Sequence, residues 1–167
     1  TFSFGRVNDV TNEQYLAVAG EIHLVAPLYG YAIPAEAIKL VSRRILGDKE
    51  TPVAFDFGNH RVVRDESGRW TIEGVPEGAN DKPLSQDDFN RWAEEWRMTS
   101  SLDAQPYKGP RGKERLVIRF KEGGSVTMDI LQKQPNFLLV RTDEAMRHRF
   151  GAEVGRRLLD PRVVAAP

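Results

Sequence analysis

Apolar and polar residues alternate along 13–25, on both sides of the dipeptide Ala19-Gly20. A period of two is typical of a half-buried strand, and a glycine-containing pair between two such runs favours a two-residue hairpin turn. The segment is therefore predicted to form a β-hairpin with one apolar face and one half-polar face. The expected partners across the apolar face are Ala17 with Ile22 and Tyr15 with Leu24.

The period changes at Pro34, where apolar residues begin to recur every three or four positions. Proline suits the first turn of a helix, basic residues suit the last turn, and Gly47 suits the left-handed residue that follows a helix. The sequence therefore predicts a helix over 34–46. The first unit, 1–47, is expected to be a hairpin followed by this helix.

The second unit, 48–104, is expected to repeat the order of strands and then a helix. A strand is predicted over 52–57 and a hairpin after it, and a turn-rich linker follows over 74–84. Ser85 is expected to cap a helix with an apolar stripe at helical spacing. The stripe consists of Phe89, Trp92, Ala93 and Trp96. The hairpin is expected to turn at Ser67-Gly68, with Val63 opposite Ile72 and Asp65 opposite Trp70.

The third unit, 105–167, contains two alternating runs whose register discriminates between turns. A two-residue turn at the double glycine would place the two apolar sets on opposite faces, whereas a three-residue loop over 122–124 keeps them on one face. The longer loop is therefore predicted. The expected pairs are Phe120 with Val126, Ile118 with Met128 and Leu116 with Ile130. The remaining expected elements are a strand over 136–141, a helix over 151–159 that Pro161 stops, and a frayed tail over 163–167.

Three units of strands followed by a helix, within one globular domain over 1–167, predict the α+β class with mostly antiparallel hairpins. The first and third units also resemble each other, since EIHLV at 21–25 is similar to NFLLV at 136–140. Two explanations stay open for this likeness. One is a degenerate internal duplication, and the other is the simple recurrence of a strand followed by a helix.

Two motifs carry a resemblance to a bacterial family. The first is the hairpin with Gly68, Trp70 and Ile72, and the second is the terminal segment in which Phe150 precedes the RRLL run at 156–159. Over nearly its whole length the chain resembles the family named domain of unknown function 4340, often found beside ABC-2-type, gliding-motility-like transporter components. The resemblance implies a membrane-anchored, extracytoplasmic accessory domain. It brings no catalytic residue to this chain.

Composition excludes several classes of protein. The 24 basic residues balance the 24 acidic ones, so the electrostatic footprint of a dedicated nucleic-acid or anionic-membrane binder is missing. With no cysteine there is no disulfide framework, iron–sulfur site or thiol nucleophile. No stretch approaches the ~18 consecutive apolar residues of a membrane-spanning helix, so this segment is not expected to insert into a membrane.

No catalytic, metal or cofactor site is predicted. The three histidines lack metal-ligand spacing, and the carboxylate doublets of the expected helix diverge by about 100° around its axis. The three tryptophans fit either an aromatic platform for a sugar or base or, at helical spacing, a core; exposure of Trp96 would favour the platform. The histidines are His23, His60 and His148, and the doublets are Asp87-Asp88 and Glu94-Glu95.

Six residues are candidates for binding a ligand. The loop 106–113 carries basic residues between glycines and prolines, which fits either a cradle for an anionic group or a solvated loop. One histidine lies between two arginines and would stand near a bound anion, or it is a structural residue. One tryptophan and one tyrosine are candidate aromatic contacts. The six are Trp70, Tyr107, Lys108, Arg111, Lys113 and His148.

The leading hypothesis is a non-enzymatic extracytoplasmic interaction domain, accessory to a membrane transport or envelope assembly. Its expected partner is a protein of a membrane-associated complex and not nucleic acid. The alternative is a ligand-binding module for a glycan, a peptide or an anionic headgroup in a cleft between units, and an enzyme is third. The family resemblance implies a hydrophobic anchor upstream of Thr1, which would place the domain in the periplasm.

Overall fold

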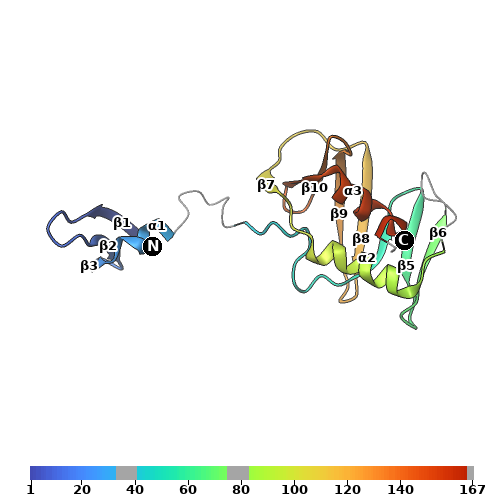
Figure 1. Ribbon diagram of the computed structural model, residues 1–167, viewed down its shortest axis with the longest axis horizontal. Helices are drawn as coiled ribbons and strands as arrows, with labels where there is room; N and C mark the ends of the chain where they lie inside the picture. Colours follow the sequence, from blue (N-terminus) through green and yellow to red (C-terminus); the bar gives the residue numbers. More distant parts are fainter. Residues whose placement is uncertain (33–40, 75–82, 165–167) are drawn as a thin grey trace. The chain divides into compact units, whose positions relative to one another are not determined.

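The computed structural model describes residues 1–32, 41–74 and 83–164 (Figure 1). Contacts within the chain form two compact units, Thr1–Val41 and Ser42–Pro167. The boundaries expected after residues 47 and 104 do not coincide with this division.

The N-terminal unit is built around a three-stranded antiparallel sheet in the order β1-β2-β3. Ala19 and Gly20 form the turn between β2 and β3 with φ angles of 52° and 91°, as the left-handed conformation of this turn requires. The predicted register is confirmed, with Ala17 opposite Ile22 and Tyr15 opposite Leu24. The elements are β1 (Phe2–Val7), β2 (Gln14–Val18), β3 (Glu21–Val25) and α1 (Pro27–Ala32).

The C-terminal unit contains one eight-stranded sheet in the order β6-β5-β4-β8-β9-β10-β11-β7, with every neighbouring pair antiparallel. Most strands follow their sequence neighbours as hairpins, but β7 pairs with β11 and so closes the far edge. The strands are β4 (Pro52–Asp56), β5 (His60–Arg64), β6 (Trp70–Gly74), β7 (Asp103–Pro106), β8 (Glu114–Phe120), β9 (Ser125–Gln132), β10 (Asn136–Arg141) and β11 (Met146–Gly151).

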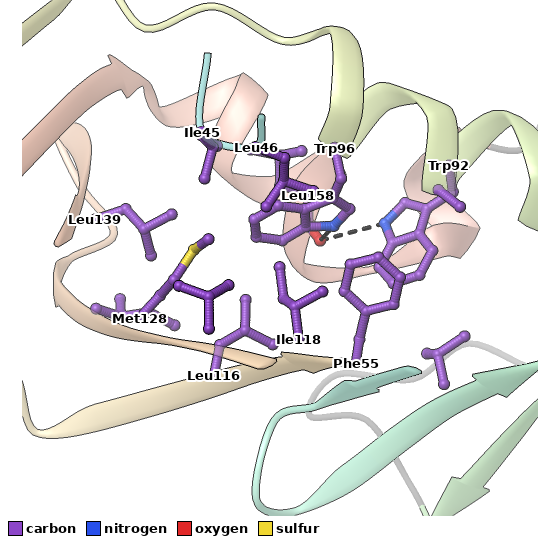
Figure 2. Close-up of a cluster of buried hydrophobic side chains, with 14 of the residues drawn as sticks. Ile45, Leu46, Phe55, Trp92, Trp96, Leu116, Ile118, Met128, Leu139 and Leu158 are labelled. Carbon is purple, nitrogen blue, oxygen red and sulfur yellow. Dashed lines mark hydrogen bonds between the residues drawn. The ribbon is translucent and has the colours of Figure 1, made fainter. Parts of the chain in front are cut away.

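Helix α2 (Gln86–Met98) confirms the predicted capped helix. Ser85 and Asp88 form a reciprocal capping box, in which each side chain accepts a hydrogen bond from the backbone N–H of the other residue. The predicted stripe is buried, and it packs with side chains from one face of the sheet into a single core (Figure 2). Trp92 and Trp96 are both 0% exposed, so the core interpretation of the tryptophans is confirmed and the platform interpretation is wrong for this pair.

Two further helices follow the sheet, α3 (Ala152–Leu159) and α4 (Pro161–Val164). Pro161 ends α3 as predicted, but it also opens α4, so the tail expected over 163–167 is helical at its first two residues; residues 165–167 lie outside the described ranges. Gly155 lets α3 approach the sheet, because a Cβ at this position would lie 2.5 Å from the Phe137 side chain.

The α+β prediction is wrong. The described residues form eleven strands and four helices, and only α2 exceeds eight residues, so the protein is mostly β. Strands from the expected second and third units join in one sheet instead of forming separate hairpin-and-helix units. The sequence pattern identified hairpins but not the pairing of β4 with β8, which joins segments more than 60 residues apart.

The helix predicted over 34–46 is also wrong where it can be compared. Residues 33–40 lie outside the described ranges, and residues 41–46 are not helical. Ile45 and Leu46 are instead buried in the core of the C-terminal unit, and Arg44 forms an isolated bridge with Ser100. The proposed duplication therefore loses its second element, because no helix over 41–46 corresponds to α3.

Two hairpin registers differ from the prediction because of where each turn lies. The first loop has three residues, 66–68, instead of the expected two; the second has the expected three residues but lies over 121–123 instead of 122–124. Gly68 and Gly123 take positive φ in these loops. Asp65 stabilises the first loop by accepting hydrogen bonds from the Ser67 hydroxyl and the Arg69 N–H. The observed pairs are Val62 with Ile72 and Arg64 with Trp70 in the first hairpin, and Leu116 with Met128 and Ile118 with Val126 in the second.

Candidate functional site

The six predicted ligand contacts are not gathered at one site. Trp70 is 2% exposed, and its indole N–H donates to Asn90 Oδ1 at 3.1 Å, so its side chain belongs to the core. His148 is 1% exposed and lies 3.3 Å from the Ser101 hydroxyl through Nδ1. Burial, followed by the nearby Arg141 charge, lowers the pKa of His148. Neither residue has the access to solvent that ligand binding requires.

Three of the other candidates line one pocket. Tyr107, Arg111 and Lys113 come from the loop before β8, and Lys133 joins them from the end of β9, around a volume of about 590 Å³. We call this the basic pocket. Lys108 is exposed in the same loop but is not among the residues of its lining. The pocket lies within the third expected unit rather than between units.

The basic pocket carries an excess of positive charge. Lys133 is paired with Glu114 at 2.7 Å, whereas no ion pair is formed by Arg111 or Lys113 among the described residues. The Tyr107 hydroxyl donates to the Pro110 carbonyl at 2.8 Å, which fixes the ring against the loop. An anionic group entering here would meet Arg111 and Lys113, while the one carboxylate of the lining, Glu114, is paired with Lys133.

A second pocket of about 350 Å³ lies next to the basic pocket, and the two share Glu114, Ile130 and Lys133. We call it the apolar pocket, because Phe57, Ile130, Leu159 and Val163 form its walls. Its residues come from β5, β8, β9, α3 and α4, which the fold brings together at one end of the sheet. Sequence reasoning missed it because these residues share no motif and are separated by up to about a hundred positions.

His60 is the buried polar residue of the apolar pocket. It is 6% exposed, and its ring stacks on Phe57 with centroids 4.5 Å apart and planes 7° apart. Nδ1 lies 2.8 Å from Asn59 Oδ1, and no hydrogen-bond partner for Nε2 occurs among the described residues. Burial lowers the pKa of His60, so the ring is neutral at neutral pH.

No family model, curated protein or solved structure matches this chain. The resemblance to the family of domain of unknown function 4340 therefore stays a prediction.

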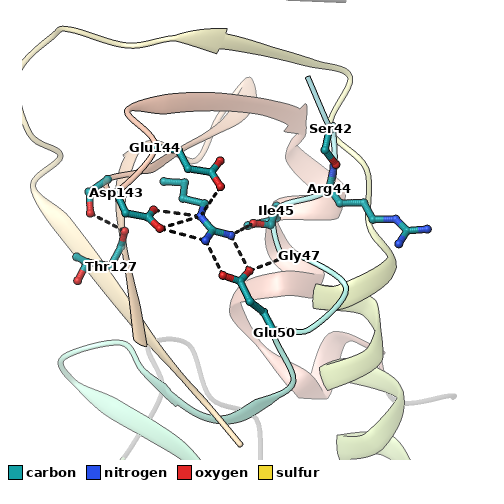
Figure 3. Close-up of polar contacts among 10 residues, drawn as sticks. Ser42, Arg44, Ile45, Gly47, Glu50, Thr127, Asp143 and Glu144 are labelled. Atoms are coloured by element: carbon teal, nitrogen blue, oxygen red, sulfur yellow. Dashed lines mark hydrogen bonds and ion pairs between the residues drawn. The ribbon is translucent and has the colours of Figure 1, made fainter. Parts of the chain in front are cut away.

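The charged cluster around the buried Arg141 has a structural role (Figure 3). Arg141 donates to both carboxylate oxygens of Glu50 at 2.7 and 2.6 Å, to the Ile45 carbonyl at 2.8 Å and to Asp143 at 3.0 Å. These hydrogen bonds lower the pKa of Glu50 and raise that of Arg141. The guanidinium is engaged by all of these partners, so the cluster ties the segment before β4 to β10.

Within the described ranges, no three acidic or histidine side chains gather closely enough to hold a metal ion. None of the described helices combines the length and the apolarity needed to cross a bilayer.

The surface of the N-terminal unit differs from that of an ordinary small domain. None of its described side chains is buried, although the sheet carries apolar residues on both faces. Tyr15, Ala17, Ile22 and Leu24 form one face, which we call the N-terminal apolar face. Ile22 is 72% exposed and Leu24 is 44% exposed. Phe2, Phe4, Leu16 and Val18 lie on the opposite face.

Proposed function

We propose that this chain is a non-enzymatic interaction domain, an extracytoplasmic accessory of a membrane transport or envelope assembly. The observation that carries the proposal is the N-terminal apolar face. A three-stranded sheet of this size needs a covered hydrophobic face or a cross-link for stability, and the chain has no cysteine to supply a disulfide. A protein partner that covers Ile22 and Leu24 would supply the missing core.

The extracytoplasmic location and the membrane-associated partner rest on the family resemblance. Exposed apolar patches on proteins commonly mark interaction sites, and a sheet edge adds unpaired N–H and C=O groups that can extend into a partner. Strand β3 is an edge strand of its sheet and carries both Ile22 and Leu24. The proposed contact therefore combines backbone pairing with burial of apolar side chains.

Photo-crosslinking in native membranes tests this function. A photoreactive phenylalanine analogue at Ile22 should give crosslinks to a protein of a membrane complex that co-purifies with the chain. The matched control places the same group at Thr71, an exposed strand position of the C-terminal unit. Identical products at both positions, or recovery of unrelated soluble enzymes alone, would contradict the proposal.

The basic pocket favours a second candidate function, a binding module for an anionic group. Arg111 and Lys113 are the cations of its lining that form no ion pair among the described residues, and Tyr107 offers an aromatic wall. A thermal-shift screen with glycans, peptides and vesicles containing anionic lipid would show stabilisation by one class only. Exchanging both cations for glutamate should abolish that shift, while Lys121→Glu, an exposed change in the loop before β9, should leave it intact.

A further inference from the structure

The hydrogen-bonding state of the His60 ring determines which kind of ligand the apolar pocket can bind. Asn59 Oδ1 can only accept a hydrogen bond, so the proton of the neutral ring lies on Nδ1 and makes the 2.8 Å contact. Nε2 is then an acceptor with a lone pair. No described residue donates to it, although the side chain is 6% exposed. Buried acceptors of this kind are nearly always satisfied, so a donor from outside the chain fits the site.

The walls around this acceptor are hydrophobic and incompletely covered. Ile130 is buried, Phe57 and Leu159 are half-buried, and Val163 is 43% exposed. A small molecule that fills the pocket would remove their remaining apolar surface from water. The parallel Phe57 and His60 rings also offer flat surfaces that favour a planar ligand.

The charges of the lining select against an ionic ligand. Each charged side chain of the lining already has a partner of opposite sign, so none of them offers an uncompensated charge to an ionic ligand. The apolar pocket therefore differs from the basic pocket, which has surplus cations. The pairs are Glu114 with Lys133, Arg115 with Asp129, Arg156 with Glu153 and Asp160 with Arg162.

We propose that the apolar pocket binds a small, uncharged and mostly apolar molecule that donates one O–H or N–H hydrogen bond to His60 Nε2. The volume of about 350 Å³ lies within the range of small-molecule sites. This binding goes beyond the proposed interaction function and does not depend on it. The two ideas fail independently, because one concerns Ile22 in the N-terminal unit and the other concerns His60 in the C-terminal unit.

Two pairs of probes test the proposal on the full chain. Indole and phenol carry one donor each, whereas 1-methylindole and anisole have similar apolar bodies without the donor. Titration followed by nitrogen and amide NMR should give saturable shifts at His60, Ile130 and Leu159 for the donors. Ligands of this size bind with a Kd of the order of 1 mM or tighter. Loss of the donor should weaken binding about tenfold, the effect of one hydrogen bond.

Variants separate hydrogen bonding from shape. His60→Phe keeps an aromatic ring beside Phe57 but removes Nε2, so it should bind each donor and its methylated analogue equally. His23→Phe, an exposed change in β3, should retain the tenfold preference. If His60→Phe does not fold, Val163→Trp tests the same pocket by filling it from an exposed position, and it should abolish binding. Val10→Trp, at a residue that is 91% exposed, is its control.

Three results would overturn the proposal. The first is the absence of saturable shifts at the pocket with both indole and phenol. The second is equal affinity of the donors and their methylated analogues for the unmodified protein. The third is a nitrogen spectrum that places the proton of the free His60 ring on Nε2, because that tautomer leaves no acceptor for the ligand.

Discussion

Strands β3 and β10 have similar sequences and opposite environments. EIHLV in β3 leaves Ile22 72% exposed, whereas the matching Phe137 of NFLLV in β10 is 0% exposed. The same contrast holds for Leu24 and Leu139, which are 44% and 0% exposed. An alternating pattern therefore specifies a strand with an apolar side, but it does not specify what covers that side.

The covering layer accounts for the difference between the two units. In the C-terminal unit α2 and α3 place Trp92, Trp96 and Leu158 over the apolar face of the sheet (Figure 2). The indole N–H groups of both tryptophans also donate to the Leu158 carbonyl, at 3.2 and 2.9 Å. They satisfy a backbone acceptor at the end of α3 that the helix itself leaves open. The described part of the N-terminal unit has no comparable layer.

Removing the covering layer should have the largest effect on stability. Trp92→Ala is expected to lower the free energy of unfolding by about 3–5 kcal/mol, because it leaves a cavity beside Phe55. In the unmodified protein the ring centroids of Trp92 and Phe55 lie 4.4 Å apart. Urea unfolding followed by tryptophan fluorescence measures this unit selectively, since all three tryptophans lie within Ser42–Pro167. A loss below about 1 kcal/mol would show that α2 does not hold this core together.

The Arg141 cluster should give the next largest effect. Arg141→Met removes the partner of Glu50, and we expect a loss of about 2–3 kcal/mol, below the value for a fully buried pair because Glu50 keeps some contact with water. Replacing both residues by methionine should recover part of the loss in the same urea experiment. A double variant less stable than Arg141→Met would mean that Glu50 stabilises the fold through other contacts, such as its bond from the Gly47 N–H.

The sequence predicted those elements that are stabilised by residues close to one another along the chain. The helix α2 follows from a Ser85 cap and an apolar stripe, and the N-terminal hairpin follows from the Ala19-Gly20 turn. Strand β11 was missed although its pattern is regular, with Met146, His148 and Phe150 all buried. Arg147 and Arg149 alternate with these buried residues along the strand.

Long-range contacts could not be predicted from this single sequence. Arg141 and Glu50 are 91 residues apart, and neither lies in a motif that points to the other. The basic loop was identified correctly as a cluster of cations, yet Tyr107, Arg111 and Lys113 become a pocket only because β9 brings Lys133 beside them. The apolar pocket depends on the packing of α3 and α4 and has no local signal at all.

Acid should destabilise the C-terminal unit by a smaller, graded amount. Burial lowers the pKa of both His60 and His148, so the unfolded chain binds more protons than the folded one. The free energy of unfolding therefore keeps its full value above the unfolded histidine pKa of about 6.5. It declines as the pH falls below that value, by at most about 1.4 kcal/mol per pH unit for each histidine. Asp56, Asp160 and Arg162 surround His60, and Arg141 and Asp103 lie near His148.

Fluorescence-detected urea unfolding between pH 7.5 and 5.5 measures this decline. Replacing His60 and His148 by glutamine should flatten the profile, whereas His23→Gln should leave its slope unchanged. A stability that rises on acidification over this range would show that the two buried rings gain protons on folding.

A substitution on the N-terminal apolar face should have the smallest effect on the free energy of unfolding. It is also the most direct test of the difference between the exposed β3 and the buried β10. Ile22→Ser should change the stability of the purified chain by less than about 0.5 kcal/mol, because the side chain is already in water. The matched change Leu139→Ser in the buried face of the large sheet should cost several kilocalories per mole, about 2–5. Hydrogen exchange of the β2 and β3 amides measures the stability of the first variant, and tryptophan fluorescence measures that of the second.

With the proposed protein partner present, the protection of the β2 and β3 amides from hydrogen exchange should rise in the unmodified chain and not in Ile22→Ser. A loss above about 1 kcal/mol in the chain alone would mean that Ile22 is already covered in solution, and the partner would then have to bind elsewhere.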